Sequence, residues 1–449
     1  MVDKAAKTGA VARGFRIGKL GFSLMGSYLG YQAQNLLLGK TTQPERRTRF
    51  RQQASQQVRE ELGALKGPVM KLGQVLSMQG EFLSEEAVRE LATLQMHAPP
   101  MHATLARAQF QSALGQDPEA LFREFDPVPV AAASLGQVHR AVTFHGEKVA
   151  VKIQYPAIRS AIEDDLKLLR SVTLPTRLTG HVPAALLDEI QRGLLEETDY
   201  VREADSLEYF RKGLAGLPHV TVPRVYREFS SDRVLTMSFV EGESLADWLK
   251  RRPSQTLRNL VAVRICEVYE TQVRWLKSIH ADQHPGNYLF RPDGHIGLVD
   301  FGCVKRTTLD IEDLRRCYQE RSWHQSEAAA RHFLRMLYGP GVPYARARKI
   351  LPALEKLVDI YRPRHSNQDR ILDFSDASRE KPGLKEAKRQ YQKQLLQDRL
   401  INAEFIFLMR AEMGLFHLLR ELRATVNISE VIRRIGTNPP PAWNGSPKP

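Results

Sequence analysis

Cysteine is scarce in this chain. The 449 residues include three cysteines: Cys266, Cys303 and Cys317. An odd number without metal-ligand spacing argues against a disulfide framework and favours a reducing, cytosolic environment. Cys303 has no neighbour in the sequence that marks it as a reactive thiolate, so we expect a structural role.

An apolar run long enough to cross a bilayer is also missing from the N-terminal part. Residues 20–38 are apolar but interrupted by Gln32, Gln34 and Asn35, whereas a spanning helix needs about 20 predominantly apolar residues. We therefore expect this segment to lie on a membrane surface.

Acidic residues are few around that segment. Residues 1–60 hold eleven Lys and Arg against three Asp and Glu, a net +8 of the chain's formal +14. Such an arm fits peripheral attachment to an anionic membrane on the cytoplasmic side. An organellar presequence, which would direct the chain to an organelle matrix, and a signal peptide without a persuasive cleavage site are the alternatives. No binding module accompanies the charge, so we expect no nucleic-acid partner.

Polar residues with the spacing of a phosphoryl-transfer site follow in the second half. Residues 280–287 read His-Ala-Asp-Gln-His-Pro-Gly-Asn, and residues 300–302 read Asp-Phe-Gly. Moving a γ-phosphoryl group requires a carboxylate near the attacking oxygen and separate oxygen ligands for Mg²⁺. Asp282 would supply the carboxylate, and Asn287 and Asp300 the ligands.

A hairpin would bring these residues together. Residues 288–290 and 296–299 are apolar and flank the turn Arg-Pro-Asp-Gly at 291–294, which is the pattern of two short antiparallel strands. Asp300 would then return beside Asn287.

A nucleotide site of this kind also needs an upstream lysine on a strand. Lys152 closes an apolar run after a turn at residues 145–148, and we expect it to hold the α and β phosphates. The loop before it contains Ala131, Ala132, Ala133 and Ser134. Its backbone N–H groups can cradle phosphate, although each Cβ limits the approach. A plain helix start is the alternative.

A carboxylate partner for Lys152 should lie on a helix, and residues 183–210 have the length and apolar recurrence of one. The carboxylates of this stretch include five candidates: Glu196, Glu197, Asp199, Glu203 and Asp205. At about 100° per residue, Asp199 and Glu203 would share a face, whereas Glu197 and Glu203 would serve different partners. The pattern alone does not select among the five.

Together these motifs resemble the UbiB family, also called ABC1 or AarF (ADCK-like) atypical kinases, within the protein-kinase-like superfamily. The resemblance is dense over residues 60–305 and weaker to about residue 430. Its most distinctive element is Lys-Leu-Gly-Gln at 71–74, which is similar to the family's KxGQ motif on an N-terminal helical extension. By composition alone this tetrapeptide is an unremarkable amphipathic helix.

The resemblance implies a role for each matching residue. Lys71 and Gln74 would point into the active site and exclude a protein substrate. Glu197 and Asp199 would form the ExD motif that meets them, and Glu203 would pair with Lys152. The remaining assignments are Met237 as gatekeeper, Phe239 in the hinge over the adenine, Asp282 as the catalytic carboxylate, and Asn287 and Asp300 as Mg²⁺ ligands.

The chain departs from the family pattern at three positions. Gln283 stands where most members have Pro, which would leave the catalytic loop slightly freer. Met96 replaces an acidic residue, and Ser206 replaces an Asn. None of these positions handles metal or phosphate, so the departures concern subfamily and regulation.

The implied fold is α+β, with the two lobes of a protein kinase: a small lobe with an antiparallel sheet and a mostly helical large lobe. A length of 449 residues suits two lobes with extensions. We expect a basic arm at 1–60, the KxGQ extension at 61–100, the small lobe at 101–242, the large lobe at 243–435 and a disordered Pro-rich tail at 436–449.

The leading functional hypothesis is a membrane-associated, kinase-like ATPase that binds ATP (or ADP) and Mg²⁺. Family association with ubiquinone biosynthesis implies a lipid or isoprenoid substrate and quinone-biosynthesis proteins as partners. One alternative is a small-molecule kinase of the aminoglycoside or choline type, although those enzymes lack the KxGQ extension. Another is a nucleotide-gated, non-catalytic scaffold of a biosynthetic complex.

Overall fold

The computed structural model describes residues 101–133, 135–160, 162–163, 191–320, 322–339, 343–361, 364–366, 369–375, 386, 390 and 402–436. The basic arm, the KxGQ segment with Lys71 and Gln74, Ser134 and nearly all of the Pro-rich tail lie outside these residues. The chain divides into two compact units, Met1–Tyr200 with Phe229–Leu235, and Val201–Glu228 with Thr236–Pro449.

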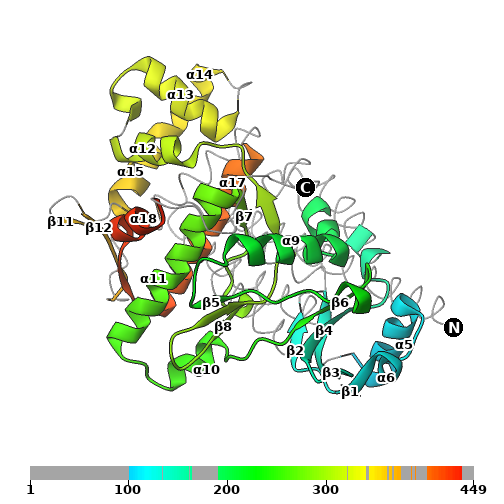
Figure 1. The fold of residues 1–449 in the computed structure, drawn as a ribbon. Coiled ribbons are helices and arrows are strands. Elements are labelled where there is room, and N and C mark those ends of the chain that lie inside the picture. Colours follow the sequence, from blue (N-terminus) through cyan, green and yellow to red (C-terminus); the bar gives the residue numbers. More distant parts are fainter. Residues whose placement is uncertain are drawn as a thin grey trace, which may run out of the picture. The chain divides into compact units, whose positions relative to one another are not determined.

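The first unit is built on an antiparallel sheet (Figure 1). Its strands are β1 (Phe122–Phe125), β2 (Ala131–Ala133), β3 (Gly136–Thr143) and β4 (Lys148–Gln154). The central strand β3 pairs with β1 and β2 along one edge and with β4 along the other. The strand β6 (Val234–Ser238), which begins in this unit, extends the sheet beyond β4.

Close approach of backbone and packing of aromatic rings stabilise this sheet. A Cβ on Gly136 would lie 2.3 Å from the Ile153 carbonyl oxygen, so only glycine lets β3 run this close to β4. The helices α5 (Ala103–Leu114) and α6 (Pro118–Leu121) precede the sheet. The ring centroid of Phe122 lies 6.0 Å from that of Phe110 and 5.3 Å from that of Phe229, within the range of favourable aromatic contact.

The second unit is mostly helical. Its helices are α9 (Tyr200–Gly213, whose first residue belongs to the first unit), α10 (Leu245–Lys250), α11 (Gln255–Thr271), α12 (Ile311–Glu320), α13 (Glu327–Tyr338), α14 (Tyr344–Ala347), α15 (Leu351–Tyr361), α17 (Ala403–Glu421) and α18 (Ile428–Gly436). The long helix α11 packs against α17 and α18 (Figure 1). The sheet of the first unit and this helical unit confirm the predicted α+β class.

Short strands of the second unit organise the loops between these helices. The strands β8 (Tyr288–Phe290) and β9 (Ile296–Leu298) form the predicted antiparallel hairpin, and β5 (Val220–Thr221) pairs parallel to β9. The strand β7 (Ser278–His280) pairs with β10 (Val304–Arg306). A third small sheet contains β11 (Arg364–Ser366), β12 (Asp369–Asp373) and β13 (Thr425–Asn427).

The prediction of one continuous helix over residues 183–210 is wrong in its middle. Residues 191–196 are helical, residues 197–199 form a turn, and α9 begins at Tyr200. The Thr198 hydroxyl donates to the Leu195 carbonyl (2.7 Å), and the Gln154 side chain donates to the Thr198 carbonyl (2.9 Å). Side-chain hydrogen bonds of this kind compete with helical backbone bonds and stop the helix.

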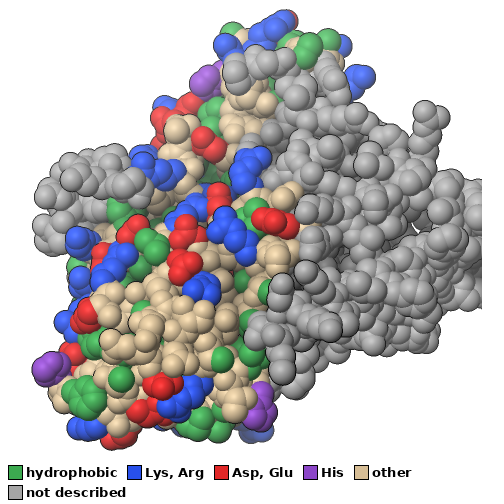
Figure 2. All heavy atoms as spheres, turned by 90° about the vertical axis from the view of Figure 1, so that its right-hand side faces the viewer, with side chains coloured by type: hydrophobic (Ala, Val, Ile, Leu, Met, Phe, Trp, Pro, Cys, Tyr) green, Lys and Arg blue, Asp and Glu red, His purple; other side chains and the backbone are tan. Residues whose placement is uncertain are grey.

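Charged side chains of both signs alternate on the face that Figure 2 shows. Over the described part of this face, Lys and Arg stand beside Asp and Glu, and apolar side chains are scattered among them. Exposed ion pairs in the described residues include Arg227 with Asp205 and Arg251 with Glu243. The described part of this face therefore carries charges of both signs and not an excess of one sign.

A buried ion pair joins α11 to α12. Arg315 donates to both carboxylate oxygens of Glu270, at 2.7 and 2.8 Å, and the Glu270 side chain is 2% exposed. A bidentate pair offsets much of the cost of removing both charges from water, but either partner alone would be strongly unfavourable.

Replacing Arg315 by Met should therefore destabilise the second unit. The variant leaves Glu270 buried without its bidentate partner, and we expect a loss of about 3–5 kcal/mol in the free energy of unfolding. Denaturant unfolding followed by circular dichroism measures this. The matched control is Lys250→Met, which removes an exposed ion pair with Asp247 and should leave the midpoint unchanged. Equal midpoints for the two variants would contradict the prediction.

Candidate active site

The loop between β7 and β8 carries two of the predicted residues and is held by its own hydrogen bonds. The Asn287 side-chain amide donates to the Asp282 carbonyl (2.8 Å), and the Asn287 N–H donates to the His284 carbonyl (3.0 Å). The Asp282 side chain is 29% exposed. The loop thus fixes Asn287 by its amide nitrogen, and the amide oxygen remains the group that can bind a cation.

The β8–β9 hairpin brings the segment of Asp300 back to this loop, as predicted. The Val299 N–H donates to the Asn287 carbonyl (3.1 Å), and His280 Nε2 donates to the Asp300 carbonyl (2.6 Å). One Asp300 carboxylate oxygen accepts the Gly302 N–H at 3.0 Å. Asn287 and Asp300 therefore come from adjacent, mutually bonded segments, and their amide and carboxylate oxygens are ligand types that suit Mg²⁺.

Gln283 does not loosen the loop between β7 and β8, contrary to the expectation from its replacement of Pro. Its side chain is buried, donates to the His280 carbonyl at 2.8 Å and accepts the hydroxyl proton of Tyr288. Burial raises the pKa of Tyr288, so the phenol stays protonated and can donate. The glutamine therefore ties the start of the loop to its end.

The helix α17 lies against this loop, which the sequence did not predict. Arg410 Nη2 lies 3.5 Å from a carboxylate oxygen of Asp282. A Cβ on Gly414 would come within 2.7 Å of the Gln283 Cβ, so the absence of a side chain at 414 permits the close packing. Nothing near Arg410 or Gly414 in the sequence signals this contact, because it joins segments far apart along the chain.

The first unit places Lys152 as predicted, inside a strand. Lys152 lies in β4 opposite Val138 of β3, its side chain is buried, and its Nζ lies 5.0 Å from the centroid of the Tyr200 ring. Burial over an aromatic ring restrains the ammonium group and provides a cation–π contact.

The alanine loop is a β-hairpin and not a helix start. Ala131, Ala132 and Ala133 form β2, which pairs with residues 136–138 of β3. Its turn lies where a nucleotide kinase carries its phosphate-binding loop. Met237 is buried in β6, and Phe239 follows the end of that strand and is half-buried.

The turn at 197–199 changes how the three helix carboxylates are presented. Glu197 is buried within the turn, Asp199 is exposed just before α9, and Glu203 is buried in the first turn of α9. Asp199 and Glu203 therefore do not share a helix face, because Asp199 is not helical. Glu203 and Lys152 belong to different units, and their pairing stays a prediction.

Replacing Gln283 by Leu should loosen the loop between β7 and β8. The variant leaves the Tyr288 hydroxyl and the His280 carbonyl without this partner, which we expect to cost about 1–3 kcal/mol in unfolding free energy. Because Tyr288→Phe breaks one of the same hydrogen bonds, the double variant should cost less than the two single variants together. Denaturant unfolding measures all three against Gln111→Leu, an exposed site on α5. Strictly additive costs would show that the two side chains act independently.

A family model matches more than half of the chain. The ABC1 atypical kinase-like domain covers residues 93–330, which includes Lys152, the helix carboxylates, the catalytic loop and Asp300. The chain is 35% identical over 229 residues to the "Probable protein kinase UbiB" of Tolumonas auensis, over 49% of this chain and 42% of the relative. It is 33% identical over 271 residues to "Protein ACTIVITY OF BC1 COMPLEX KINASE 7, chloroplastic" of Arabidopsis thaliana, over 60% of this chain and 39% of the relative.

A solved structure extends the likeness to most of the chain. The complex of Rv3197 with erythromycin from Mycobacterium tuberculosis is 25% identical and has a TM-score of 0.57, covering 90% of this chain and 100% of that one. The chain spans less than half the length of the curated relatives it matches. None of the helices that the structure describes combines the length and apolar content needed to cross a membrane. On the match over residues 93–330, and in agreement with the motifs, this chain belongs to the ABC1 atypical kinase-like family.

Proposed function

We propose that this protein binds Mg²⁺ and ATP and cleaves the γ-phosphate, either by hydrolysis or by transfer to a lipid-like acceptor at a membrane surface. The observation that carries the proposal is the mutual bonding of the segments with Asp282, Asn287 and Asp300. A carboxylate beside two oxygen ligands is the arrangement that phosphoryl transfer requires.

Each residue would have a separate task. Asn287 and Asp300 would hold Mg²⁺, which neutralises charge on the phosphates when bound. Asp282 would orient or deprotonate the attacking hydroxyl or water. In the first unit, Lys152 would bind the α and β phosphates, and the hairpin that includes Ala131–Ala133 would cover them with backbone N–H groups.

The membrane and the lipid are supported by different observations. The basic arm, residues 1–60 with a net +8, is suited to an anionic bilayer surface. A role in ubiquinone or isoprenoid lipid metabolism rests on the family and on the relative named UbiB. Regulation by Lys71, Gln74, Glu197 and Asp199, and work with other quinone-biosynthesis proteins, are proposed on the same resemblance.

A second candidate is phosphotransfer to a small molecule. The solved structure of Rv3197 is a complex with erythromycin, so a protein with a similar fold accommodates a compound that is neither nucleotide nor protein. This candidate uses the same residues and differs in the acceptor. Comparing phosphate release with phosphorylation of an added macrolide or lipid separates hydrolysis from the two transfer reactions.

Replacing Asp300 by Asn should abolish turnover. Loss of a charged metal ligand costs several kcal/mol of transition-state stabilisation, so we expect Mg²⁺-dependent ATP turnover to fall at least about 100-fold. The full chain is assayed with and without anionic vesicles, and turnover should rise with the vesicles. Asp293→Asn, in the turn of the same hairpin, is the matched control and should retain activity.

Three outcomes of this assay bear on the proposal. Stimulation by neutral vesicles equal to that by anionic ones would remove the electrostatic role of the arm. Turnover that survives Asp300→Asn would remove the proposed metal site. Tight ATP binding without turnover under any condition would replace the enzyme by a nucleotide-gated scaffold.

Replacing Arg410 by Met should lower the rate more than the affinity for ATP. Arg410 contacts the carboxylate of Asp282, so its loss frees the group that positions the nucleophile. We expect turnover at saturating ATP to fall about tenfold, equivalent to about 1.4 kcal/mol, with little change in KM. The control is Arg420→Met on the exposed face of α17. A raised turnover would instead identify Arg410 as a brake on Asp282.

A further inference from the structure

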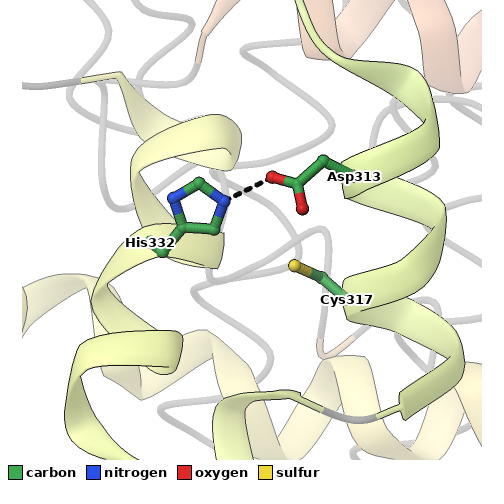
Figure 3. A group of neighbouring side chains, drawn as sticks. All are labelled: Asp313, Cys317 and His332. Carbon is green, nitrogen blue, oxygen red and sulfur yellow. Dashed lines mark hydrogen bonds and ion pairs between the residues drawn. The ribbon is translucent and has the colours of Figure 1, made fainter.

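Three metal-ligating side chains meet in the second unit, away from the residues assigned to phosphate chemistry. Asp313 and Cys317 project from α12 toward His332 on α13 (Figure 3). One ligand atom from each residue lies within 4.8 Å of the other two. The mechanism proposed above uses none of these residues.

The local structure sets this convergence. Asp313 and Cys317 are four residues apart on one helix, which places both on the same face. The chain reverses through a short 3-10 turn, Ser322–His324, and α13 begins after the Ser326 cap. The rings of Trp323 and Phe333 pack at 4.8 Å, beside His332 in the sequence. The three side chains are therefore brought together by packing that does not itself require a ligand.

Burial and charge within the cluster suit a cation. His332 Nε2 and an Asp313 carboxylate oxygen share a hydrogen bond, so these two ligand atoms already face one another. Cys317 is buried, whereas the His332 side chain is 55% exposed. The cluster thus combines a buried thiol with an imidazole that a cation can reach from solvent.

Arg316 is the charged group that opposes this use. Its Nη2 lies 3.0 Å from the other Asp313 oxygen, and its side chain is 60% exposed. Because it contacts the oxygen that does not face His332, it can orient the carboxylate from outside, as outer partners of metal ligands do. Its exposure also lets it move into water when a cation arrives.

The donor set selects the metal. Sulfur, nitrogen and carboxylate oxygen together suit Zn²⁺, whereas Mg²⁺ and Ca²⁺ prefer oxygen alone. Metal–ligand bonds of about 2.0–2.3 Å place tetrahedral ligands roughly 3.3–3.8 Å apart. Side-chain rotations that shift the ligand atoms by about an ångström would bring the cluster to this geometry. We propose that Asp313, Cys317 and His332 form a zinc site that ties α12 to α13. Water would take the fourth position, the Cys317 thiol proton would be released to solvent, and His332 would bind through Nε2 as a neutral imidazole with its proton on Nδ1.

The described residues offer a matched comparison without a thiol. His324 Nε2 lies 2.8 Å from a Glu355 carboxylate oxygen, and the His324 side chain is 53% exposed. This pair has the same imidazole and carboxylate chemistry and nearly the same exposure as His332 and Asp313. It has no place in the cluster of three, so substituting His324 tests what an ordinary His–carboxylate pair contributes.

Cobalt titration of the reduced, chelator-treated full chain tests the proposal. Co²⁺ reports thiolate coordination by a charge-transfer absorption, and Zn²⁺ should displace it at one equivalent while excess Mg²⁺ should not. Cys317→Ser should remove the absorption. His332→Gln and Asp313→Asn should each weaken Zn²⁺ binding at least about tenfold, since even outer partners of metal ligands cost about 10–100-fold. His324→Gln should bind Zn²⁺ as the unaltered chain does.

Thermal unfolding with and without Zn²⁺ separates binding from folding. Zn²⁺ should raise the Tm of the unaltered chain and of His324→Gln, but not that of His332→Gln, whose exposed side chain makes misfolding a minor concern. A charge-transfer absorption that survives Cys317→Ser would overturn the proposal. Equal Zn²⁺ affinities in the His332→Gln and His324→Gln chains would also overturn it. The three residues would then form only a structural contact, a hydrogen bond between two helices beside a buried cysteine.

Discussion

The hydrogen bonds to main-chain carbonyls around the β8–β9 hairpin are the constraint on which the candidate active site depends. They join the Asn287 carbonyl to Val299 and the Asp300 carbonyl to the His280 ring. The segments that carry the proposed metal ligands are therefore held at their main-chain carbonyls, while the Asn287 side-chain amide and one Asp300 carboxylate oxygen make hydrogen bonds of their own within the two loops. Preorganisation of this kind lets electrostatic stabilisation act without a cost of reorganisation at the moment of reaction.

Buried amide side chains extend that constraint into the core. Gln272, in the π-helical turn Gln272–Leu276 at the end of α11, accepts the His280 N–H at 2.9 Å, and Gln283 bonds the same residue from the other side. Such turns are often found at functional sites. Each of these amides is buried, so losing one of their hydrogen bonds would leave a polar group unpaired at considerable cost. Two buried amide side chains thus anchor the start of the loop at the backbone of His280.

Local patterns predicted the parts of the fold that local forces build. The turn at Arg291–Gly294 between two apolar runs predicted the β8–β9 hairpin, and the turn before Val149 predicted the strand that carries Lys152, since turn residues and strand alternation act over a few neighbours. The helix over 183–210 failed at Thr198, where a hydrogen bond from Gln154 competes with the helical pattern. The prediction that Gln283 loosens its loop failed for a similar reason, because the role of this side chain depends on Tyr288 and on the glycine at 414. Arg410 was not predictable at all, since only the packing of α17 brings it to Asp282.

The cysteines show the same division between local and tertiary information. Spacing along the chain excludes a cysteine-rich metal motif, and that exclusion holds for ligands supplied by neighbouring cysteines. The exclusion does not apply to a metal site whose sulfur ligand comes from one helix and whose nitrogen ligand comes from the next helix. Asp313 and Cys317 share a helical face, yet their meaning depends on the turn that places His332 opposite them. Phosphate chemistry leaves a sequence signature because its residues lie on consecutive loops, whereas a bridge between two packed helices becomes visible only after they are packed.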